Sequence, residues 1–330
     1  MQSFEETIRR LARIPDLNIL AGVLLSGRTR FGIGGPADLY VETSNERSFI
    51  EGLKTARTSG HDYVVIGDGT NLIVADDGFR GVVLRFTANG IRHMGTCIQA
   101  YAGAELQRLV DYSIEHGLRG IETMTGIPGS VGAAVYGNAG AYGHSIMERV
   151  YQVRFFDGEV ERVFDNAQCE FQYRESVFKR HKDWIIFSTD LHLDVSPAAE
   201  LRRAAGDILK IRNQKYPPTM KCAGSIFKNL ILAELPGDVQ SKVPARVIRE
   251  GKVPSAYFLE EVGAKGLKNG GIHVAGYHAN LIYNAGSGTA RELREVIGDL
   301  KARVHAKFGL LLEEEVQYVG FESNNGSRPA

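Results

Sequence analysis

The stretch GIPGSVGAAVYGNAGAYG spans residues 126–143 and is the most glycine-dense part of the chain. Its glycines recur at intervals of three residues in two runs: Gly126, Gly129 and Gly132, then Gly137, Gly140 and Gly143. So many small residues let a backbone lie flat against a large planar ligand and leave N–H groups able to donate. A structural loop that packs two domains together would have the same composition. The stretch therefore predicts either a ligand-binding loop or a packing loop.

A second, shorter glycine turn follows an apolar strand pattern. Gly67 and Gly69 begin like a dinucleotide-binding turn, but Leu72 stands where that fingerprint needs a third glycine, and no helix follows. Together with Thr70 and Asn71, the two glycines can still form a nest of backbone N–H groups for a pyrophosphate. An ordinary tight turn is the alternative. Because the two glycine turns end successive α+β units, they favour one extended cofactor that spans both, and FAD has that shape.

The periodicity of apolar residues predicts a mixed α and β chain. The first 20 or so residues predict a helix, and residues 38–67 predict a β-α-β unit. A second strand–helix unit begins near Cys97, and the strand pattern stops near residues 195–200. Long amphipathic helices are predicted after that point, at residues 199–215 and 289–309, with short strands between and after them.

Composition excludes several classes of protein. The chain has 330 residues, which suggests two or three domains, and its 39 basic and 39 acidic residues leave no field that would attract nucleic acid. The three cysteines (Cys97, Cys169 and Cys222) form no CxxC pair, which disfavours disulfides and a zinc site. No His and acidic residues show metal spacing, so we expect no metal. Without a signal-like start or a run of about 20 apolar residues, a cytoplasmic protein is expected.

Seven motifs then stand in a fixed order along the chain. They are TRFGIGGPAD (29–38), VIGDGTNLIVADDGFRGVV (65–83), GIPGSVGAAVYGNAGAYG (126–143), YRESVFK (173–179), AGSIFKN (223–229), HANLIYNAG (278–286) and FGLLLEEEV (308–316). In this order they resemble the UDP-N-acetylenolpyruvoylglucosamine reductase family over about residues 20–320. Seven motifs in register are highly specific. The short spacing between the YRESVFK and AGSIFKN motifs resembles the type II branch of that family.

The resemblance implies an α+β fold with four parts. These are an N-terminal helix within residues 1–25, two FAD-binding subdomains of the vanillyl-alcohol-oxidase (PCMH) type over 26–197, a C-terminal α+β substrate-binding domain over 198–322, and a disordered tail over 323–330. It also implies a reaction in which NADPH reduces noncovalent FAD. The enolpyruvyl ether of UDP-N-acetylglucosamine is then reduced to UDP-N-acetylmuramate, in peptidoglycan precursor synthesis. No obligatory protein partner, nucleic acid or membrane is expected.

The glycine turns and the resemblance together predict the FAD contacts. They are Gly67, Asp68, Gly69, Thr70, Asn71, Gly126, Ile127, Gly129, Ser130, Gly132, Ala133, Asn138 and Gly140. The resemblance also implies four substrate contacts. Tyr173 would stack near the site, Lys215 would contact phosphate or the nicotinamide nucleotide, Lys228 would assist proton transfer, and Asn229 would contact a carbonyl or the diphosphate.

The resemblance assigns catalysis to Arg174, Ser225 and Glu315. Hydride from flavin N5 would arrive at C3 of the enolpyruvyl group, so negative charge builds on C2 and its carboxylate and needs fixed positive charge and a proton. Arg174 matches the family's charge-stabilising arginine, Ser225 matches its proton donor, and Glu315 matches a glutamate that orients the substrate or shares a proton. Local chemistry alone allows other interpretations: an arginine paired with Glu170 or Glu175, a helix-capping serine, and a solvated glutamate run.

The chain departs from the family pattern at three places. Many members carry an arginine where this chain has Gly32, for which Arg28 or Arg30 could substitute, and Leu230 replaces a proline. Residues 231–258 form a longer and more charged stretch, which we expect to be a surface insertion. Two other functions remain open at this point: a flavin oxidase or dehydrogenase of the same fold acting on a sugar or alcohol, and a non-catalytic flavin- or nucleotide-binding module.

Overall fold

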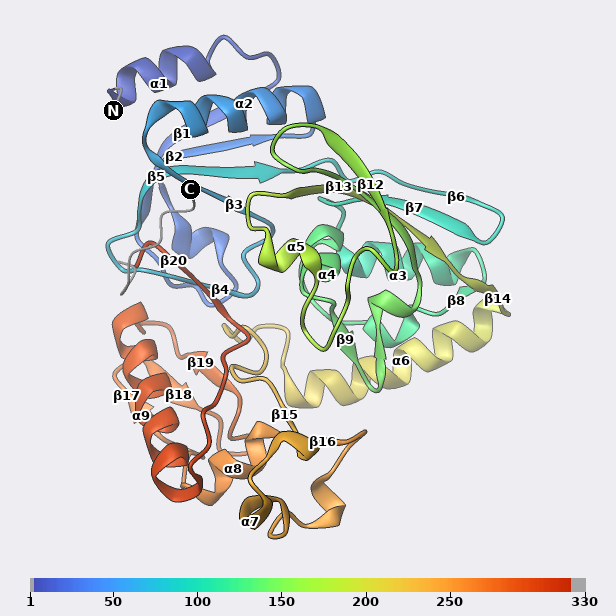
Figure 1. The fold of residues 1–330 in the computed structure, drawn as a ribbon, viewed down its shortest axis with the longest axis vertical. Helices are drawn as coiled ribbons and strands as arrows, with labels where there is room; N and C mark the ends of the chain where they lie inside the picture. Colours follow the sequence, from blue (N-terminus) through green and yellow to red (C-terminus); the bar gives the residue numbers. More distant parts are fainter. Residues whose placement is uncertain (1–2, 322–330) are drawn as a thin grey trace. The chain divides into compact units, whose positions relative to one another are not determined.

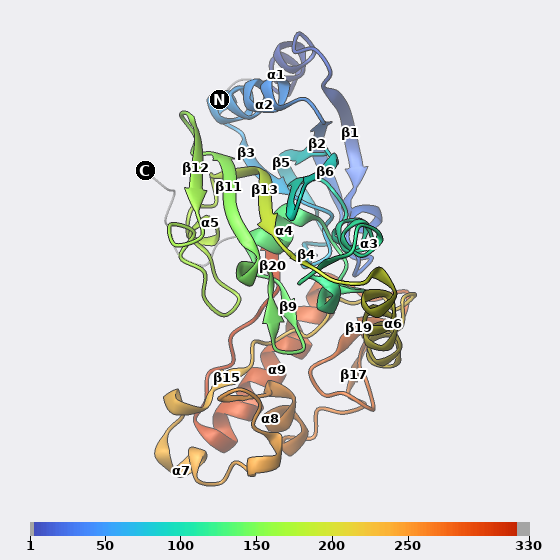
Figure 2. The ribbon, with the colours of Figure 1, turned by 90° about the vertical axis from the view of Figure 1, so that its right-hand side faces the viewer.

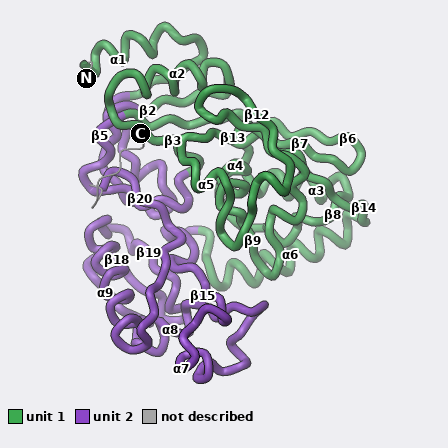
Figure 3. Tube along the Cα trace, viewed as in Figure 1, with its two compact units in different colours: residues 1–20, 40–68, 82–218 green, residues 21–39, 69–81, 219–330 purple. Residues whose placement is uncertain are grey.

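The computed structural model describes residues 3–321, so the tail expected over residues 323–330 lies outside the described part. The chain divides into two compact units, each built from separate segments (Figure 3). Unit 1 contains residues 1–20, 40–68 and 82–218, and unit 2 contains residues 21–39, 69–81 and 219–330. Helix α6 (Ala198–Lys215), which follows the domain boundary expected at residues 197–198, packs within unit 1.

The N-terminal helix is much shorter than the sequence predicts. Helix α1 covers only Phe4–Leu11 and begins at Ser3, whose side chain accepts from the N–H of Glu6. Pro15 cannot continue a helix, and Asp16 has a φ of 56°, in the left-handed region. The chain turns there and continues as a strand, so the expected helix over the first 20 or so residues is wrong beyond Leu11.

The first sheet has four strands in the order β1-β2-β5-β3 (Figure 1). They are β1 (Asn18–Leu24), β2 (Pro36–Thr43), β3 (Asp62–Ile66) and β5 (Phe79–Phe86). Helix α2 (Glu46–Ser59) connects β2 to β3, as the predicted β-α-β unit requires. Asn45 caps the start of α2, and Gly60, at φ 78°, ends it in the left-handed conformation. Helix α1 lies beside α2 in Figures 1 and 2.

The second sheet belongs to unit 1 and is antiparallel throughout, in the order β12-β11-β13-β7-β6 (Figure 2). Its strands are β6 (Ile91–Met94), β7 (Cys97–Tyr101), β11 (Val150–Phe156), β12 (Glu161–Asp165) and β13 (Ile185–His192). Phe49 of α2, Phe86 and Phe187 meet edge to face, with Phe86 and Phe187 5.0 Å apart between ring centroids. This aromatic cluster joins the helix to the second sheet.

Short elements complete unit 1 around the glycine-rich stretch. They are α3 (Leu106–Glu115), β8 (Leu118–Arg119), η2 (Glu122–Met124), α4 (Val131–Tyr136), β9 (Gly140–Ala141), β10 (His144–Ser145), η3 (Ile146–Glu148), α5 (Val177–Arg180) and β14 (Asp194–Val195); the short helix η1 (Leu25–Arg28) belongs to unit 2. The stretch 126–143, expected as a loop, thus contains the helix α4. Ser130 caps this helix by accepting from the N–H of Ala133 at 3.3 Å, and the small residues Ala133 and Ala134 favour helix.

Unit 2 packs its helices and short strands around one apolar core, which includes Phe227, Phe258 and Leu300. Its elements are β4 (Leu72–Val74), β15 (Leu230–Ile231), η4 (Leu232–Glu234), α7 (Gly237–Gln240), η5 (Ala245–Val247), β16 (Lys252–Val253), α8 (Ser255–Glu261), β17 (Lys268–Asn269), β18 (Ile272–Val274), β19 (Ile282–Asn284), α9 (Ala290–Phe308) and β20 (Gln317–Val319). A capping box between Thr289 and Glu292 starts α9. Strand β20 pairs in parallel with β4, so the end of the chain returns to the GDGTN turn.

The predicted α+β character is therefore present in both units, and the two long helices after residue 195 are found as α6 and α9. Residues 231–258, expected as an insertion, form β15, η4, α7, η5, β16 and the start of α8. Within residues 3–321, no helix combines the length and apolar character needed to cross a membrane.

Candidate active site

In unit 1, Gly67 at the start of the GDGTN turn lies close to the glycine-rich stretch. A Cβ atom added to Gly67 would lie 3.0 Å from Ser130 Oγ and 3.6 Å from Ala133 Cβ. Gly132 is equally restricted, because its added Cβ would lie 2.8 Å from Ala102 Cβ. Gly67, Ser130, Gly132 and Ala133 therefore form one narrow cradle of small residues, and small residues of this kind let a pyrophosphate approach the backbone.

Gly126 holds the start of this cradle in place. Its N–H donates to Gln107 Oε1 at 2.6 Å, and its carbonyl accepts from Arg212 Nε at 2.7 Å. Gly126 has a φ of 78°, and an added Cβ would lie 2.8 Å from Arg212 Cδ, so only glycine suits this position. Arg212, on α6, is a residue that sequence reasoning missed; its place three residues before Lys215 was the available signal.

Asp68, expected as a cofactor contact, forms an ion pair within unit 1. Its Oδ1 lies 2.5 Å from Arg85 Nη2, and Arg85 Nη1 lies 3.8 Å from Glu42 Oε2. The side chains of Asp68 and Arg85 are about one quarter exposed. Such a partly buried pair fixes the turn that carries Gly67. The cofactor role of Asp68 stays a prediction.

Asn138 stands at the end of the glycine-rich stretch and organises the backbone around it. It has a φ of 43°, which asparagine tolerates better than most residues. Its Nδ2 donates to the carbonyl of Gln172 at 2.7 Å, and its Oδ1 accepts from the N–H of Met147 at 3.3 Å. Because Asn138 is only 2% exposed, its amide serves chiefly to hold neighbouring backbone.

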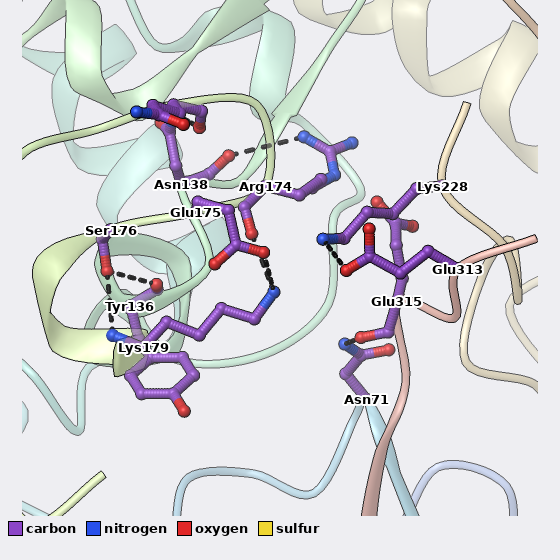
Figure 4. A network of polar contacts seen from close by, with 11 residues as sticks. Asn71, Tyr136, Asn138, Arg174, Glu175, Ser176, Lys179, Lys228, Glu313 and Glu315 are labelled. Atoms are coloured by element: carbon purple, nitrogen blue, oxygen red, sulfur yellow. Dashed lines mark hydrogen bonds and ion pairs between the residues drawn. The ribbon is translucent and has the colours of Figure 1, made fainter. Parts of the chain in front are cut away.

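Arg174 lies in a tight turn over residues 172–175, closed by two backbone hydrogen bonds of 3.1 Å. It has a φ of 59°, a left-handed conformation that is unusual for a residue with a long side chain. The guanidinium donates to the carbonyl of Asn138 at 3.4 Å (Figure 4) and to that of Gly140 at 2.8 Å. Its Cζ lies 5.3 Å from the centroid of the Tyr173 ring. The carbonyls of the glycine-rich stretch thus fix the orientation of the positively charged guanidinium of Arg174.

Lys179 braces the turn that carries Arg174. Its Nζ donates to the carbonyl of Arg174 at 2.9 Å and to Glu175 Oε1 at 2.7 Å (Figure 4). Glu170, the other acidic residue weighed as a partner for Arg174, pairs with Arg180. Lys179 is therefore a further residue of this site that sequence reasoning did not select, although it closes the YRESVFK motif.

Tyr136, at the end of α4, lies under the same turn. Its carbonyl accepts from Ser176 Oγ at 2.7 Å, which ties α4 to the cap of α5. Burial, together with the nearby charge of Glu175, raises the pKa of Tyr136 to about 12. The ring therefore stays neutral at physiological pH.

In unit 2, the segment Ser225–Lys228 runs between two other stretches of backbone. On one side, Ser225 bridges to Leu281, and the N–H of Ile226 donates to the carbonyl of Asn280 at 3.1 Å. On the other side, the N–H of Lys228 donates to the carbonyl of Glu313 at 2.9 Å. The AGSIFKN, HANLIYNAG and FGLLLEEEV motifs are thus neighbours in space, which brings Ser225 and the glutamate run into one unit.

Asn280 locks this arrangement and was missed as a site residue, although it lies in one of the seven motifs. It is 2% exposed, and its amide both donates to the carbonyl of Phe227 at 2.8 Å and accepts from the N–H of Phe227 at 2.9 Å. A side-chain amide that replaces a strand partner in this way fixes the backbone on both sides of Phe227.

The three consecutive glutamates have different environments. Glu313 pairs with Lys228, whose side chain is only 10% exposed. Glu314 lies 2.7 Å from Lys301 Nζ and accepts from the hydroxyl of Tyr318; its side chain is 16% exposed, so the expectation of a solvated face is wrong for Glu314. Glu315 is half-buried, and its N–H donates to the carbonyl of Ile226 at 2.8 Å.

The remaining predicted residues are divided between the two units. Unit 1 holds Ile127, whose N–H donates to Met124, and Lys215, whose Nζ lies 5.0 Å from the Tyr216 ring centroid. Unit 2 holds Gly69, Thr70 and Asn229. None of these observations tests a cofactor or substrate contact directly. Among the described residues, no group of three or more His, Cys, Asp or Glu side chains is placed to hold a metal ion.

Comparison with known proteins identifies the class. Residues 37–163 match the FAD binding domain family, and residues 216–319 match the family described as UDP-N-acetylenolpyruvoylglucosamine reductase, C-terminal domain. The chain is therefore an FAD-dependent flavoprotein. The glycine cradle in unit 1 lies within the first matched region, which agrees with this conclusion.

Relatives along the whole chain identify the family. A UDP-N-acetylenolpyruvoylglucosamine reductase from Solibacter usitatus is 63% identical over 94% of this chain and 100% of its own length. The protein of that name from Bacillus subtilis is 31% identical over 96% of this chain and 99% of its own. A crystal structure of the reductase from Thermus caldophilus superposes with a TM-score of 0.70 at 27% identity, covering 92% of this chain and 98% of that one. The chain belongs to the UDP-N-acetylenolpyruvoylglucosamine reductase family, and the predicted family and fold class are confirmed.

Proposed function

We propose that this chain reduces the enolpyruvyl ether of UDP-N-acetylglucosamine to UDP-N-acetylmuramate, an early reaction of peptidoglycan synthesis. The observation that carries the proposal is the 63% identity to a reductase of that name over 94% of the chain. FAD held at the cradle would supply the chemistry that the side chains lack, which is hydride transfer between NADPH and the alkene. The protein's own residues then bind, orient and protonate the substrate.

We assign the stabilisation of developing charge to Arg174. A guanidinium keeps its charge at any relevant pH and can form two parallel hydrogen bonds to a carboxylate. Support comes from its setting: two backbone carbonyls, of Asn138 and Gly140, orient the guanidinium, and Lys179 fixes the peptide behind it. A group held this firmly needs little reorganisation when charge builds on the substrate.

We assign the proton to Ser225. A serine hydroxyl is a weak acid, so it can protonate only a strongly basic carbon centre such as an enolate. Support comes from the fixed backbone around it: Ser225 bridges to Leu281, and the adjacent Ile226 is bonded on both sides, to Asn280 and to Glu315. Lys228, nearly buried and paired with Glu313, places a positive charge three residues further along the same segment.

We assign orientation of the substrate, or sharing of its proton, to Glu315. The roles of Tyr173, Lys215 and Asn229 at the substrate, and of the cradle residues at FAD, are proposed on the same family basis. We further propose that the enzyme acts in the cytoplasm without an obligatory protein partner. The support is a small-molecule substrate and the lack of a membrane-spanning helix within residues 3–321.

Two half-reactions test the proposal. Purified protein should be yellow, NADPH should bleach the flavin under anaerobic conditions, and the enolpyruvyl substrate should restore its colour. Ser225→Ala should keep the first half-reaction and lose the second, because only the second consumes a proton at carbon. Ser241→Ala, an exposed serine of the same unit, is the matched control. If oxygen alone restores the colour of the wild-type flavin, the chain is an oxidase and the proposal is wrong.

A further inference from the structure

Asn71 joins the GDGTN turn to the glutamate run within unit 2. Its Nδ2 donates to the carbonyl of Glu315 at 2.8 Å, and its own carbonyl accepts from the N–H of Gln317 at 3.0 Å (Figure 4). These two bonds start the parallel pairing that continues as β4 and β20. Residues 244 positions apart in the chain thereby become neighbours.

The turn that carries Asn71 is itself fixed. Gly69 has a φ of 66°, and a Cβ added there would lie 2.0 Å from the carbonyl oxygen of Arg28. The carbonyl of Gly69 accepts from the N–H of Arg30 at 3.2 Å. Because the turn is held against residues 28–30 on one side, the Asn71 amide has one fixed position. The Glu315 carbonyl that it binds is therefore fixed as well.

Glu315 is therefore held at both of its backbone polar groups. Its N–H donates to Ile226, next to Ser225, and its carbonyl accepts from Asn71. The bond to Ile226 is backbone to backbone and survives most substitutions. The bond from Asn71 depends on one side-chain amide, so a single substitution can release the peptide that follows Glu315.

We propose that Asn71 is a positioning residue for Glu315, and that this, not a cofactor contact, is the task of its side-chain amide. The proposal rests on the proposed role of Glu315 in the reduction. Asn71 fixes the peptide plane after Glu315 and thereby the direction in which the Glu315 carboxylate points. The turn expected to serve only the cofactor would also set the geometry of the substrate reaction.

Asn71→Asp is the sharpest variant, because it keeps the shape of the side chain and replaces the donor by an oxygen that repels the Glu315 carbonyl. We expect the rate of flavin reoxidation by the enolpyruvyl substrate to fall about tenfold or more. We expect the dissociation constant of FAD from the apoprotein and the rate of flavin reduction by NADPH to stay within about threefold of wild type. Asn269→Asp is the matched control, since the Asn269 amide also donates a hydrogen bond within the same unit, in this case to the side-chain carboxylate of Glu295.

The variant Glu315→Gln separates positioning from other effects. If Asn71 acts through Glu315, adding Asn71→Asp to the Glu315→Gln variant should lower the rate of flavin reoxidation by less than about threefold. A full additional loss in that background would overturn the proposal. So would weakened FAD binding with equal losses in both half-reactions, or a Glu315→Gln variant with the wild-type reoxidation rate.

The outcome does not depend on one substitution. If Asn71→Asp unfolds, Asn71→Ser removes the amide with less repulsion and must show the same pattern, with melting temperature recorded for each variant. Failure of the proposed function has a different signature: wild-type flavin, reduced by NADPH, would then not be reoxidised by the enolpyruvyl substrate at all.

Discussion

Lys179→Met tests whether the brace behind Arg174 matters for the reduction. The substitution keeps the length of the side chain but removes the hydrogen bonds to the carbonyl of Arg174 (2.9 Å) and to Glu175 (2.7 Å). A hydrogen bond from a charged donor contributes about 1.5–3 kcal/mol, and the left-handed conformation of Arg174 costs about 1–2 kcal/mol. Without the brace, the turn is free to relax toward an unstrained conformation.

The expected size of the effect follows from these values. If about 1.4–2.8 kcal/mol of the lost interaction had served to order Arg174, the substrate half-reaction should slow by about 10- to 100-fold. The lysine and its glutamate partner are 21% and 31% exposed, so screening by solvent favours the lower end of that range. Stopped-flow absorbance of flavin reoxidation measures this rate, and flavin reduction by NADPH in the same sample should change little.

Two controls make the result decisive. Lys182→Met removes an exposed lysine close in sequence and should leave both half-reactions unchanged. The double variant Lys179→Met with Glu175→Gln removes the carboxylate that the single variant leaves without its lysine. If the double variant recovers the wild-type rate, the loss came from that unpaired charge and not from Arg174. Wild-type reoxidation in Lys179→Met itself would refute the reasoning outright.

Three further predictions concern the cradle, the alkaline limb and the thiols. Gly67→Ala places a methyl group 3.0 Å from Ser130 Oγ and should disturb the cap of α4. We expect it to weaken FAD binding about five- to tenfold in a fluorescence titration. Gly206→Ala, in α6 with open space around it, should leave FAD binding unchanged. The pKa of Tyr136 is raised to about 12, so the folded state keeps this proton longer than the unfolded chain, whose tyrosines titrate near 10. The free energy of unfolding should therefore fall as pH rises from about 10 to 12, by at most about 2–3 kcal/mol, and Tyr136→Phe should flatten this slope in urea titrations. Burial raises the pKa of the Cys97 thiol above its usual value, and it raises the pKa of the Cys169 thiol to about 12. A thiol reagent at neutral pH should therefore label half-buried Cys97 first and slowly, and spare buried Cys169 and Cys222.

Much of the fold could be predicted from sequence because it rests on local signals. The capping box at Thr289 and the apolar periodicity after it define α9, and Asn45 and Gly60 delimit α2. The N-terminal region fails for a local reason too: an apolar face continues past Leu11, but Pro15 ends the helix. Periodicity alone does not reveal that Pro15, which has no backbone N–H to donate, stops the helix.

The site residues could be predicted only in part, because their partners are distant in sequence. Asn138 and Arg174 are 36 residues apart, and the bond between them runs to a backbone carbonyl, which leaves no mark on residue type. The same holds for Asn280 and Phe227, 53 residues apart. Motif order selected the residues, but only the folded chain reveals that the carbonyl groups of Asn138 and Gly140 accept hydrogen bonds from the guanidinium of Arg174.

Gly32 illustrates how a departure from a family pattern acquires a physical meaning. The resemblance implies an arginine at this position, for which Arg28 or Arg30 could substitute. In unit 2, a Cβ added to Gly32 would lie 3.0 Å from Lys221 Cδ and 3.5 Å from its Nζ. A longer side chain at position 32 and the Lys221 stem would therefore compete for one space, and the φ of 66° at Gly32 further favours glycine. Lys221 thus places a positive charge beside position 32, from a residue 189 positions further along the chain. It is therefore a further candidate, besides Arg28 and Arg30, for the contact that the resemblance assigns to an arginine at position 32.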